Sequence, residues 1–359
     1  MWSTHSQGTA SADNADPTGH TITIRSPDDN PVRTAQTQPS TSSSTMLAKL
    51  SIALLSAAST VLAAPLHYDP VLRPTMYDRE TLRTITDDIP VKQIHSHNDY
   101  WREKPLLTAL SNGVQSVEAD VWYYGNENQD ETIYVGHNFV SLTGIRTFQS
   151  LYIDPLYNIL DLKNVQRELD QDLDDRTHPS GVFEMDSGKT LYLFVDLKTD
   201  GNATFEPVYN ALKPLRDQGW LTTYNATTDK LDYSVVTVIG TGNTPLDKVK
   251  ALTTRDFFFD APLGDLDGIT PGISPIASGS LNHILGSEKQ LTFPQTGLSD
   301  DQITKVKSVV DDAHSKGLLT RIWEAPLWTN KLKLNVWEQL IDLGSDFLNA
   351  DNLEQAAAL

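Results

Sequence analysis

The chain has 359 residues, which is enough for one large domain or two domains of average size. It carries 28 lysine and arginine residues against 47 aspartate and glutamate residues, so its formal net charge is −19. This balance argues against nonspecific binding to nucleic acid or to an anionic bilayer, because both depend on positive surface. The chain contains no cysteine, which excludes disulfides and thiol chemistry.

The N-terminal quarter of the sequence does not have the pattern of a folded domain. Residues 1–45 are polar and lack apolar periodicity, which predicts a disordered or untranslated extension. Residues 46–63 combine a basic start, an apolar run and a small-residue end, and this run is shorter than the ~20 residues of a membrane span. We therefore expect a signal peptide and a secreted protein, with glycosylation sequons at Asn202 and Asn225. Residues 64–90 are expected to form an N-terminal arm.

The segment 91–138 concentrates the polar residues that can carry chemistry. Its pattern predicts a strand ending in His95 and His97, a helix over residues 105–113, a strand carrying Glu118 and Asp120, and a strand ending at His137. Because side chains alternate along a strand, His95 and His97 share one face, as do Glu118 and Asp120. Catalytic groups at strand ends are typical of the C-terminal mouth of a parallel barrel.

The rest of the chain alternates between strand and helix patterns. Residues 190–197 form a near-continuous apolar run, which is typical of a strand covered on both faces. The other predicted elements are a helical pattern over 146–169, a helix at about 206–218, strands at 234–240, 318–326 and 345–351, an apolar run at 256–262, and helices at 299–317 and 333–344, the first opened by a capping box of Ser299 and Gln302. About eight strands in this order predict an α/β fold, a single-domain TIM (β/α)8 barrel over residues 91–359.

Three carboxylates at strand ends indicate a cation site. Glu118 and Asp120 present hard oxygen ligands on one strand face, and Asp196 ends an apolar strand, a set that suits Mg²⁺ or Ca²⁺. Such a cation would also allow an anionic substrate despite the negative net charge. The residues alone leave other interpretations open. Glu118 and Asp120 could lie on the solvent side of a half-buried strand, Asp196 could pair with Lys198, and each histidine could have a structural role.

Short motifs in this segment resemble a known superfamily. HSHNDY, followed by SVEADV and YVGHN, resembles the phospholipase-C-like phosphodiesterases, metal-dependent TIM barrels that include glycerophosphodiester phosphodiesterases and sphingomyelinase D. LYLFVDLKTDG looks like the third metal-ligand strand of the sphingomyelinase D branch, and the overall layout is similar to the fungal altered inheritance of mitochondria protein six family. The HRG and PENT motifs of glycerophosphodiesterases are missing, and Asp196 stands where those enzymes usually have glutamate.

The resemblance implies a metal-dependent phosphoric diester hydrolase, or a cyclising phosphodiesterase, that acts on a phospholipid or glycerophosphodiester. The partner that the resemblance implies is this substrate. The negative net charge excludes nucleic acid as a partner, and we expect at most peripheral contact with a membrane and a monomer. Carried over residue by residue, it implies Glu118, Asp120 and Asp196 as metal ligands, His97 and His137 as the acid/base pair, and Lys198, Trp323, His95 and Asn98 around the substrate. His97 is chosen over His95 because Pro105 follows it by eight residues, much as in the family motif.

Two other functions fit parts of the pattern. His95, Ser96 and His97 form an HxH at the end of a first strand, as in amidohydrolase-like metallo-hydrolases, although that chemistry needs more histidines at later strand ends. A catalytically silent secreted barrel that binds lipid headgroups or glycans is the alternative from a different class.

Overall fold

The computed structural model describes residues 77–125, 131–169, 178–286 and 293–359. These ranges belong to one compact unit, residues 67–359. The predictions for residues 1–45 and 46–63 lie outside the described residues, as do residues 64–76 of the predicted arm. The described end of the arm contains helix α2 (Arg79–Thr84), which begins where the Asp78 side chain accepts the backbone N–H of Thr81.

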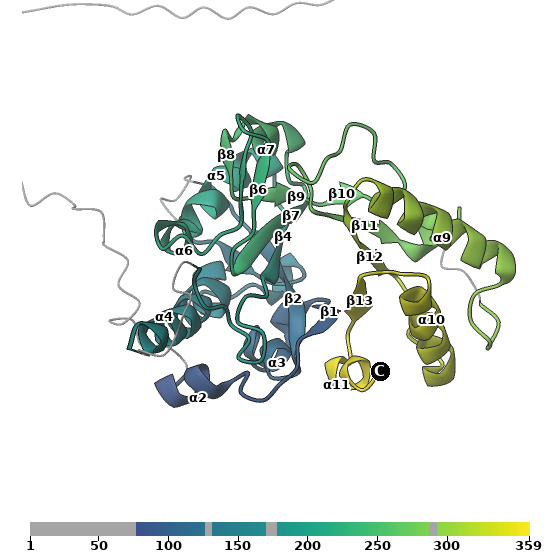
Figure 1. Cartoon of the computed structure of the whole chain (residues 1–359), viewed down its shortest axis with the longest axis horizontal. Coiled ribbons are helices and arrows are strands. Elements are labelled where there is room, and N and C mark those ends of the chain that lie inside the picture. The colour runs from purple at the N-terminus through teal and green to yellow at the C-terminus, as the bar shows by residue number, and fades with distance from the viewer. Residues whose placement is uncertain (1–76, 126–130, 170–177, 287–292) are drawn as a thin grey trace, which may run out of the picture. The chain divides into compact units, whose positions relative to one another are not determined.

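A parallel barrel forms the centre of the unit (Figure 1). Its order is β10, β11, β12, β13, β1, β2, β4, β7, β9, and every pairing along this path is parallel. The bounds are β1 Lys92–Ser96, β2 Val114–Trp122, β4 Leu191–Leu197, β7 Val236–Gly242, β9 Phe258–Phe259, β10 Ala261–Pro262, β11 Ile276–Ser280, β12 Leu319–Trp323 and β13 Phe347–Ala350. Since β9 and β10 are two halves of one strand interrupted at Asp260, the barrel has eight strand positions, and the predicted TIM barrel is confirmed.

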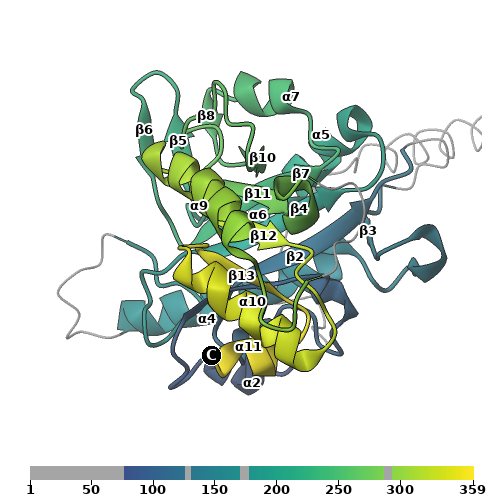
Figure 2. The same cartoon turned by 90° about the vertical axis from the view of Figure 1, so that its right-hand side faces the viewer.

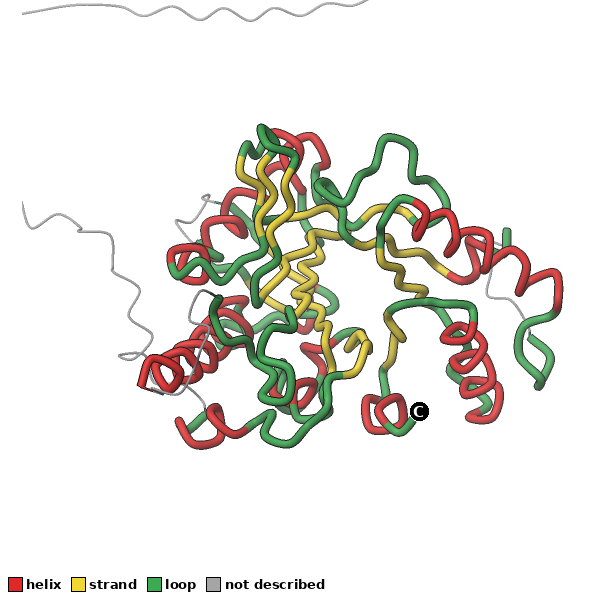
Figure 3. The backbone as a smooth tube through the Cα atoms, in the orientation of Figure 1, coloured by secondary structure: helices red, strands yellow, loops and turns green. Residues whose placement is uncertain are grey.

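Helices lie outside the strands, as Figure 3 shows. They are α3 Leu107–Leu110, the π-helical turn η5 Gln149–Ile153 running into α4 Asp154–Leu169, α5 Gly201–Ala211, α6 Lys213–Asp217, α7 Leu246–Ala251, α8 Leu281–Ile284, α9 Asp300–Ser315, α10 Asn330–Asp342 and α11 Leu353–Ala357. Short 3-10 turns occur at η2 (Asp99–Trp101) and η4 (Phe139–Ser141). None of the helices in the described ranges is long and apolar enough to cross a membrane.

Two strand predictions differ from the structure. The strand expected to end at His137 is β3 (Tyr134–Val135), a two-residue strand antiparallel to β2 that takes no place in the barrel. The missing eighth strand is β11, which lies in a Gly, Ser and Pro-rich passage without an apolar run. A separate small sheet, antiparallel at both of its pairings, joins β5 (Thr223–Asn225), β6 (Lys230–Asp232) and β8 (Thr254–Arg255).

Helix boundaries follow local hydrogen bonding more closely than apolar spacing. The helix expected over residues 105–113 is only the single turn α3, because Leu106 has a φ of 63° and its N–H donates to the buried Asp99 carboxylate. The helix expected at 206–218 begins earlier, at α5, where Asp200 caps it. The capping box of Ser299 and Gln302 opens α9 as predicted.

The inside of the barrel has an apolar floor and a polar upper part. The buried side chains of the floor are Tyr192, Phe194, Ile239, Phe258, Ile276 and Phe347. Residues two and four positions further along the same strands point to the same face, so they line the barrel toward its C-terminal mouth. These positions include Asp196, Asp260 and Asn349. The polar candidates of the sequence therefore lie above the floor, where such barrels place their sites.

Candidate active site

The predicted ligand carboxylates meet at the C-terminal ends of β2 and β4. In the register of β2 and β4, Asp120 is paired with Asp196. Glu118 lies two residues before Asp120, on the same face of β2. One carboxylate oxygen from each of the three residues lies within 4.8 Å of the other two. Glu118 and Asp120 are buried, and the Asp196 side chain is 16% exposed toward the mouth.

This carboxylate cluster fits a divalent cation. Oδ1 of Asp120 is buried without a hydrogen-bond partner among the described residues, although an unsatisfied buried carboxylate oxygen is costly. Its Oδ2 accepts the Tyr100 hydroxyl at 2.7 Å and lies 2.9 Å from Lys198 Nζ. Three hard oxygen donors within 4.8 Å of one another suit Mg²⁺ or Ca²⁺ rather than a soft metal.

Lys198 bridges two members of the carboxylate cluster. Its Nζ lies 2.6 Å from Asp196 Oδ2 and 2.9 Å from Asp120 Oδ2. Burial disfavours the Lys198 ammonium, but the charges of Asp120 and Asp196 outweigh burial and raise its pKa. The pairing of Asp196 with Lys198 considered from sequence is thus present, and it leaves the Lys198 charge at the barrel mouth.

The three carboxylates differ in pKa because burial and neighbouring charges act on them to different extents. Burial, with the Glu118 charge, raises the pKa of Asp120 to about 7, and burial likewise raises the pKa of Asp196. Burial also acts on Glu118, but the Arg321 guanidinium and the His97 imidazole beside it more than offset burial and hold the Glu118 pKa below its usual range. Glu118 is therefore the most readily ionised carboxylate of the cluster, and a bound cation would favour the ionised forms of Asp120 and Asp196.

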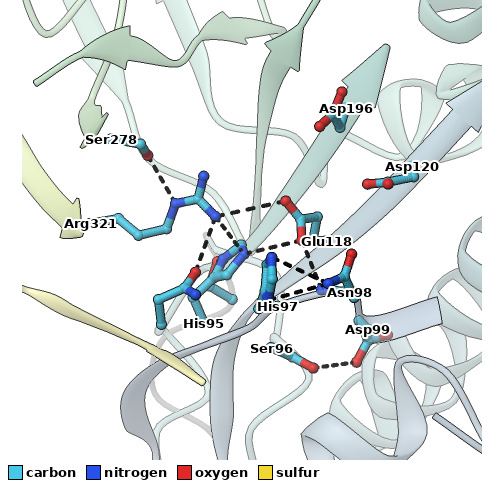
Figure 4. Close-up of polar contacts among 12 residues, drawn as sticks. His95, Ser96, His97, Asn98, Asp99, Glu118, Asp120, Asp196, Ser278 and Arg321 are labelled. Carbon is cyan, nitrogen blue, oxygen red and sulfur yellow. Dashed lines mark hydrogen bonds and ion pairs between the residues drawn. The ribbon is translucent and has the colours of Figure 1, made fainter. Parts of the chain in front are cut away.

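His97 follows β1 and lies next to Asn98 and Glu118 (Figure 4). Its Nδ1 lies 2.8 Å from Asp351 Oδ1, just after β13, so Nδ1 carries the proton and donates. Burial lowers the tendency of His97 to protonate, yet the Asp351 hydrogen bond and the Glu118 charge prevail and raise its pKa. Nε2, 3.2 Å from the Asn98 amide nitrogen, is left as the atom that can exchange a proton with substrate.

His137 follows the short strand β3 and lies beside Asp120 of the carboxylate cluster. Its Nδ1 lies 3.0 Å from the Tyr100 hydroxyl and 3.8 Å from Asp120 Oδ2, and its ring packs on Trp101 with 4.8 Å between centroids. The side chain is 47% exposed. The structure thus places both His97 and His137 near the carboxylate cluster, and His137 comes from a loop after β3 rather than from a barrel strand.

His95 and Asn98 contact residues around the carboxylate cluster through hydrogen bonds. Nε2 of His95 lies 2.7 Å from Arg321 NH1, and because arginine can only donate, this nitrogen accepts while Nδ1 donates to Ser116 Oγ at 2.8 Å. Burial and the Arg321 charge lower the His95 pKa to about 3, so the imidazole is neutral. Asn98 adopts a left-handed backbone with a φ of 50°, and its N–H donates to Glu118 Oε2 at 2.8 Å.

Sequence reasoning missed Arg321, Asp260, Asp351 and Tyr100. Arg321 lies on β12, is 4% exposed, and reaches Ser278 Oγ at 2.9 Å, Glu118 Oε1 at 3.8 Å and Asp260 Oδ2 at 3.6 Å. A charged residue inside the apolar run LLTRIW is the signal that could have revealed it. The predicted Trp323 follows on the same face of β12 and is half-buried at the mouth.

Comparisons with known proteins decide the family. The AIM6-like phosphodiesterase domain matches residues 83–260. Altered inheritance of mitochondria protein 6 homolog of Arthroderma benhamiae is 40% identical over 278 residues, covering 76% of this chain and 85% of that protein. The chain belongs to the altered inheritance of mitochondria protein 6 family.

Two further comparisons agree in part with this assignment. Altered inheritance of mitochondria protein 6 of Lachancea thermotolerans is 40% identical over 290 residues, which cover 75% of this chain and 66% of that protein. The solved structure of a glycerophosphodiester phosphodiesterase from Parabacteroides distasonis aligns with a TM-score of 0.40 at 12% identity, over 75% of this chain and 97% of that one. A score this low adds nothing to the functional argument.

The family corrects one prediction. Secretion was expected from residues 46–63 and from the two sequons, but the relatives are named for altered inheritance of mitochondria. These names point to a connection with mitochondria rather than to export, so the prediction of a secreted protein is wrong. An apolar run after a basic start has no feature that fixes its destination, which is why the sequence pattern misled.

Gly242 lies against Asp196, so adding a side chain at this position should disturb the carboxylate cluster directly. Its φ is 63°, and a Cβ there would lie 2.0 Å from Asp196 Oδ1. We expect Gly242→Ala to displace Asp196, weakening Mn²⁺ binding and lowering turnover by roughly 10²-fold, since small misplacements of catalytic groups are costly. Calorimetric titration with Mn²⁺ and a turnover assay measure both effects.

Gly268 provides the matched control. Its φ is 66°, and nothing lies within 4 Å of an added Cβ. Gly268→Ala should therefore cost only backbone strain, about 1–2 kcal/mol of unfolding free energy, and leave metal affinity unchanged. Equal metal affinities in the two variants would contradict the role assigned to Gly242.

Asp351→Asn should change the pH dependence of activity. The Asp351 carboxylate raises the pKa of His97, so its removal lowers that pKa and His97 loses its proton at lower pH. If His97 acts as the acid, the alkaline limb of the kcat/KM profile moves to lower pH. Asp346→Asn is the control, because Asp346 forms an equivalent 2.8 Å pair with His314 elsewhere. An unshifted alkaline limb would remove His97 from this role.

Proposed function

We propose that this chain is a metal-dependent phosphodiesterase that cleaves a phosphoric diester at the mouth of its barrel. The observation that carries the proposal is the carboxylate cluster of Glu118, Asp120 and Asp196. One buried Asp120 oxygen has no hydrogen-bond partner in the described part of the chain, and two imidazoles lie beside the cluster. Membership of a family whose domain is described as phosphodiesterase supports the reaction class.

Glu118, Asp120 and Asp196 would hold the cation, with Mg²⁺ as the first choice for three hard oxygen donors. When bound, such an ion acts as a Lewis acid on nonbridging phosphate oxygens and orients the diester. Lys198, at the edge of the carboxylate cluster, adds a fixed positive charge for the same phosphate. Burial of Glu118 and Asp120 keeps water from the inner side of the site.

The two histidines would move the protons. His97, whose Nδ1 proton is held by Asp351, donates from Nε2 to the departing alkoxide. His137, held at Nδ1 by the Tyr100 hydroxyl, takes the proton of the attacking hydroxyl. The attacking hydroxyl belongs either to water, which gives hydrolysis, or to the substrate itself, which gives a cyclic phosphate. Phospholipids and glycerophosphodiesters are the proposed substrates.

The position of His95 weakens the amidohydrolase alternative. An HxH metal site needs a lone pair on each histidine, but both His95 nitrogens are engaged, one as acceptor from Arg321 and one as donor to Ser116. The catalytically silent barrel is the remaining alternative, and it predicts metal or lipid binding without turnover.

Turnover by the full chain tests the proposal. Glycerophosphocholine, lysophosphatidylcholine and sphingomyelin are incubated with Mg²⁺ or with chelator, and phosphorus NMR separates linear from cyclic products. We expect metal-dependent cleavage that falls by about 10²–10⁴-fold in His97→Gln. His314→Gln, which removes a histidine with the same 2.8 Å carboxylate pairing, should keep full activity. Cleavage unaffected by chelator or by His97→Gln would refute the proposal.

A further inference from the structure

Large apolar side chains are exposed on one half of the barrel mouth. Trp101, Phe139, Val140, Ile145, Leu327 and Trp328 are each between 60% and 90% exposed. They lie on the loops after β1, after β2 and β3, and after β12. Because the barrel order is β12, β13, β1, β2, these loops neighbour one another, and Figure 2 shows the segment after β3 projecting beyond the strands. We call these six residues the apolar rim.

The apolar rim is continuous with the candidate active site. The Trp101 ring packs on His137, and the Tyr100 hydroxyl beside it reaches Asp120. The loop that carries Phe139 and Val140 leaves β3 at Val135 and returns at Arg146, where Val135 N–H donates to the Arg146 carbonyl. A surface that covers the rim therefore also covers the route into the site.

Basic side chains lie beside the apolar rim. The loop after β1 carries Arg102 and Lys104, the loop after β3 carries Arg146, and the start of α10 carries Lys331 and Lys333, while Glu103 and Glu324 are exposed acidic residues on the loops after β1 and β12. Lys104 and Lys331 are exposed. Arg102 and Arg146 donate to backbone carbonyl oxygens, which fixes the loops themselves. Exposed tryptophan and aliphatic side chains flanked by lysine are the combination that suits a lipid interface, with rings at headgroup depth and ammonium groups on phosphates.

We propose that the apolar rim docks on a lipid surface and presents the site to a phosphodiester headgroup in that surface. This inference rests on the proposed function and narrows its substrate to a lipid taken from a bilayer or micelle. The contact that we propose is made by loops, because the apolar rim lies on the loops at the barrel mouth. Exposed apolar patches of this kind mark interaction surfaces, and the adjacent phosphodiester site favours lipid over a protein partner.

The absence of cysteine in the sequence allows a site-specific test on the full chain. Single cysteines replace Val140, Leu327 or, as a control, Met185, and each is labelled with an environment-sensitive nitrobenzoxadiazole dye. Met185 is 62% exposed but lies on the loop that enters β4, at the other end of the barrel. On adding phosphatidylcholine vesicles, we expect fluorescence to rise several-fold at Val140→Cys and Leu327→Cys and to stay constant at Met185→Cys. All three labelled proteins contain residues 46–63. A difference in fluorescence between the labelled positions therefore reports contact at the rim and not binding through that segment.

A second substitution tests the contribution of the rim itself. Trp328→Ser in the Val140→Cys background should weaken vesicle binding by about tenfold while far-UV circular dichroism stays unchanged. No rise at the rim labels, or an equal rise at Met185→Cys, would overturn the proposal, as would a rise with protein concentration alone, which would indicate contact between copies. Rim signals without turnover of lysophosphatidylcholine, sphingomyelin or glycerophosphocholine would support the docking surface and refute only the proposed function.

Discussion

Asp120→Asn should abolish metal-dependent turnover and yet make the metal-free protein more stable above pH 7. The activity loss is expected to be roughly a thousandfold or more, because a Lewis-acid cation contributes several kcal/mol to the barrier and each 1.36 kcal/mol is tenfold. The stability gain follows from the Asp120 pKa, which burial and the Glu118 charge raise to about 7. Asparagine keeps the shape of the protonated acid and cannot ionise.

The direction of the pH effect follows from proton linkage. The folded protein holds the Asp120 proton up to about pH 7, whereas the unfolded chain loses it near pH 3.8. Stability from this group is therefore fully present below pH 3.8 and is lost as pH rises through 7, by on the order of 4 kcal/mol. Urea unfolding of both proteins in chelator at pH 5 and pH 8 measures this. Parallel curves for the two proteins at both pH values would contradict the account.

Arg321→Met should be the most destabilising single substitution in the barrel interior. It removes the guanidinium that lies between Glu118 and Asp260, both buried, and that donates to His95. Removing one partner of a buried ionic network typically costs about 3–5 kcal/mol, because the remaining charges are uncompensated. We also expect weaker Mn²⁺ binding and slower turnover, since Glu118 loses a group that orients it.

Arg216→Met separates the structural part of this effect from the functional part. Arg216 pairs with the buried Asp256 at the opposite end of the barrel, with a 3.2 Å hydrogen bond from NH2 to Oδ1. Its loss should lower the unfolding free energy without changing Mn²⁺ affinity. Arg321→Lys should restore part of the metal affinity lost in Arg321→Met by keeping the charge. Equal metal affinity in Arg321→Met and Arg216→Met would show that Arg321 has only a structural role.

The barrel could be predicted because its parallel strands are buried on both faces and leave long apolar runs, as in residues 190–197. β11 could not be predicted because its residues are mostly small and lack an apolar pattern. Its position in the barrel depends on its pairing with β10 and β12. β3 was misjudged because two residues carry no information about parallel or antiparallel pairing. Strand direction is a property of the partner, which a single sequence does not show.

Some residues of the site could likewise be predicted from the sequence, and others could not. Glu118, Asp120 and Asp196 were predictable because acidic residues within apolar strands need a reason to be buried. The roles of Arg321 and Asp351 depend on the register of β12 and β13 around the closed barrel, which brings them to residues more than 200 positions away. His97 was preferred to His95 in the sequence only through its spacing to Pro105. In the structure His95 is a neutral imidazole with both nitrogens engaged, whereas His97, two residues later, lies at the mouth.

The most direct test of the account is to locate a cation in crystals of the protein grown with Mn²⁺, using anomalous scattering. We predict one peak bonded to carboxylate oxygens of Glu118, Asp120 and Asp196, at the ~2.0–2.6 Å of hard-cation sites, with Lys198 Nζ moved off the Asp120 oxygen. A folded protein without a peak at these three carboxylates, or with Mn²⁺ bound elsewhere in the barrel, would contradict the metal site on which the proposed reaction depends.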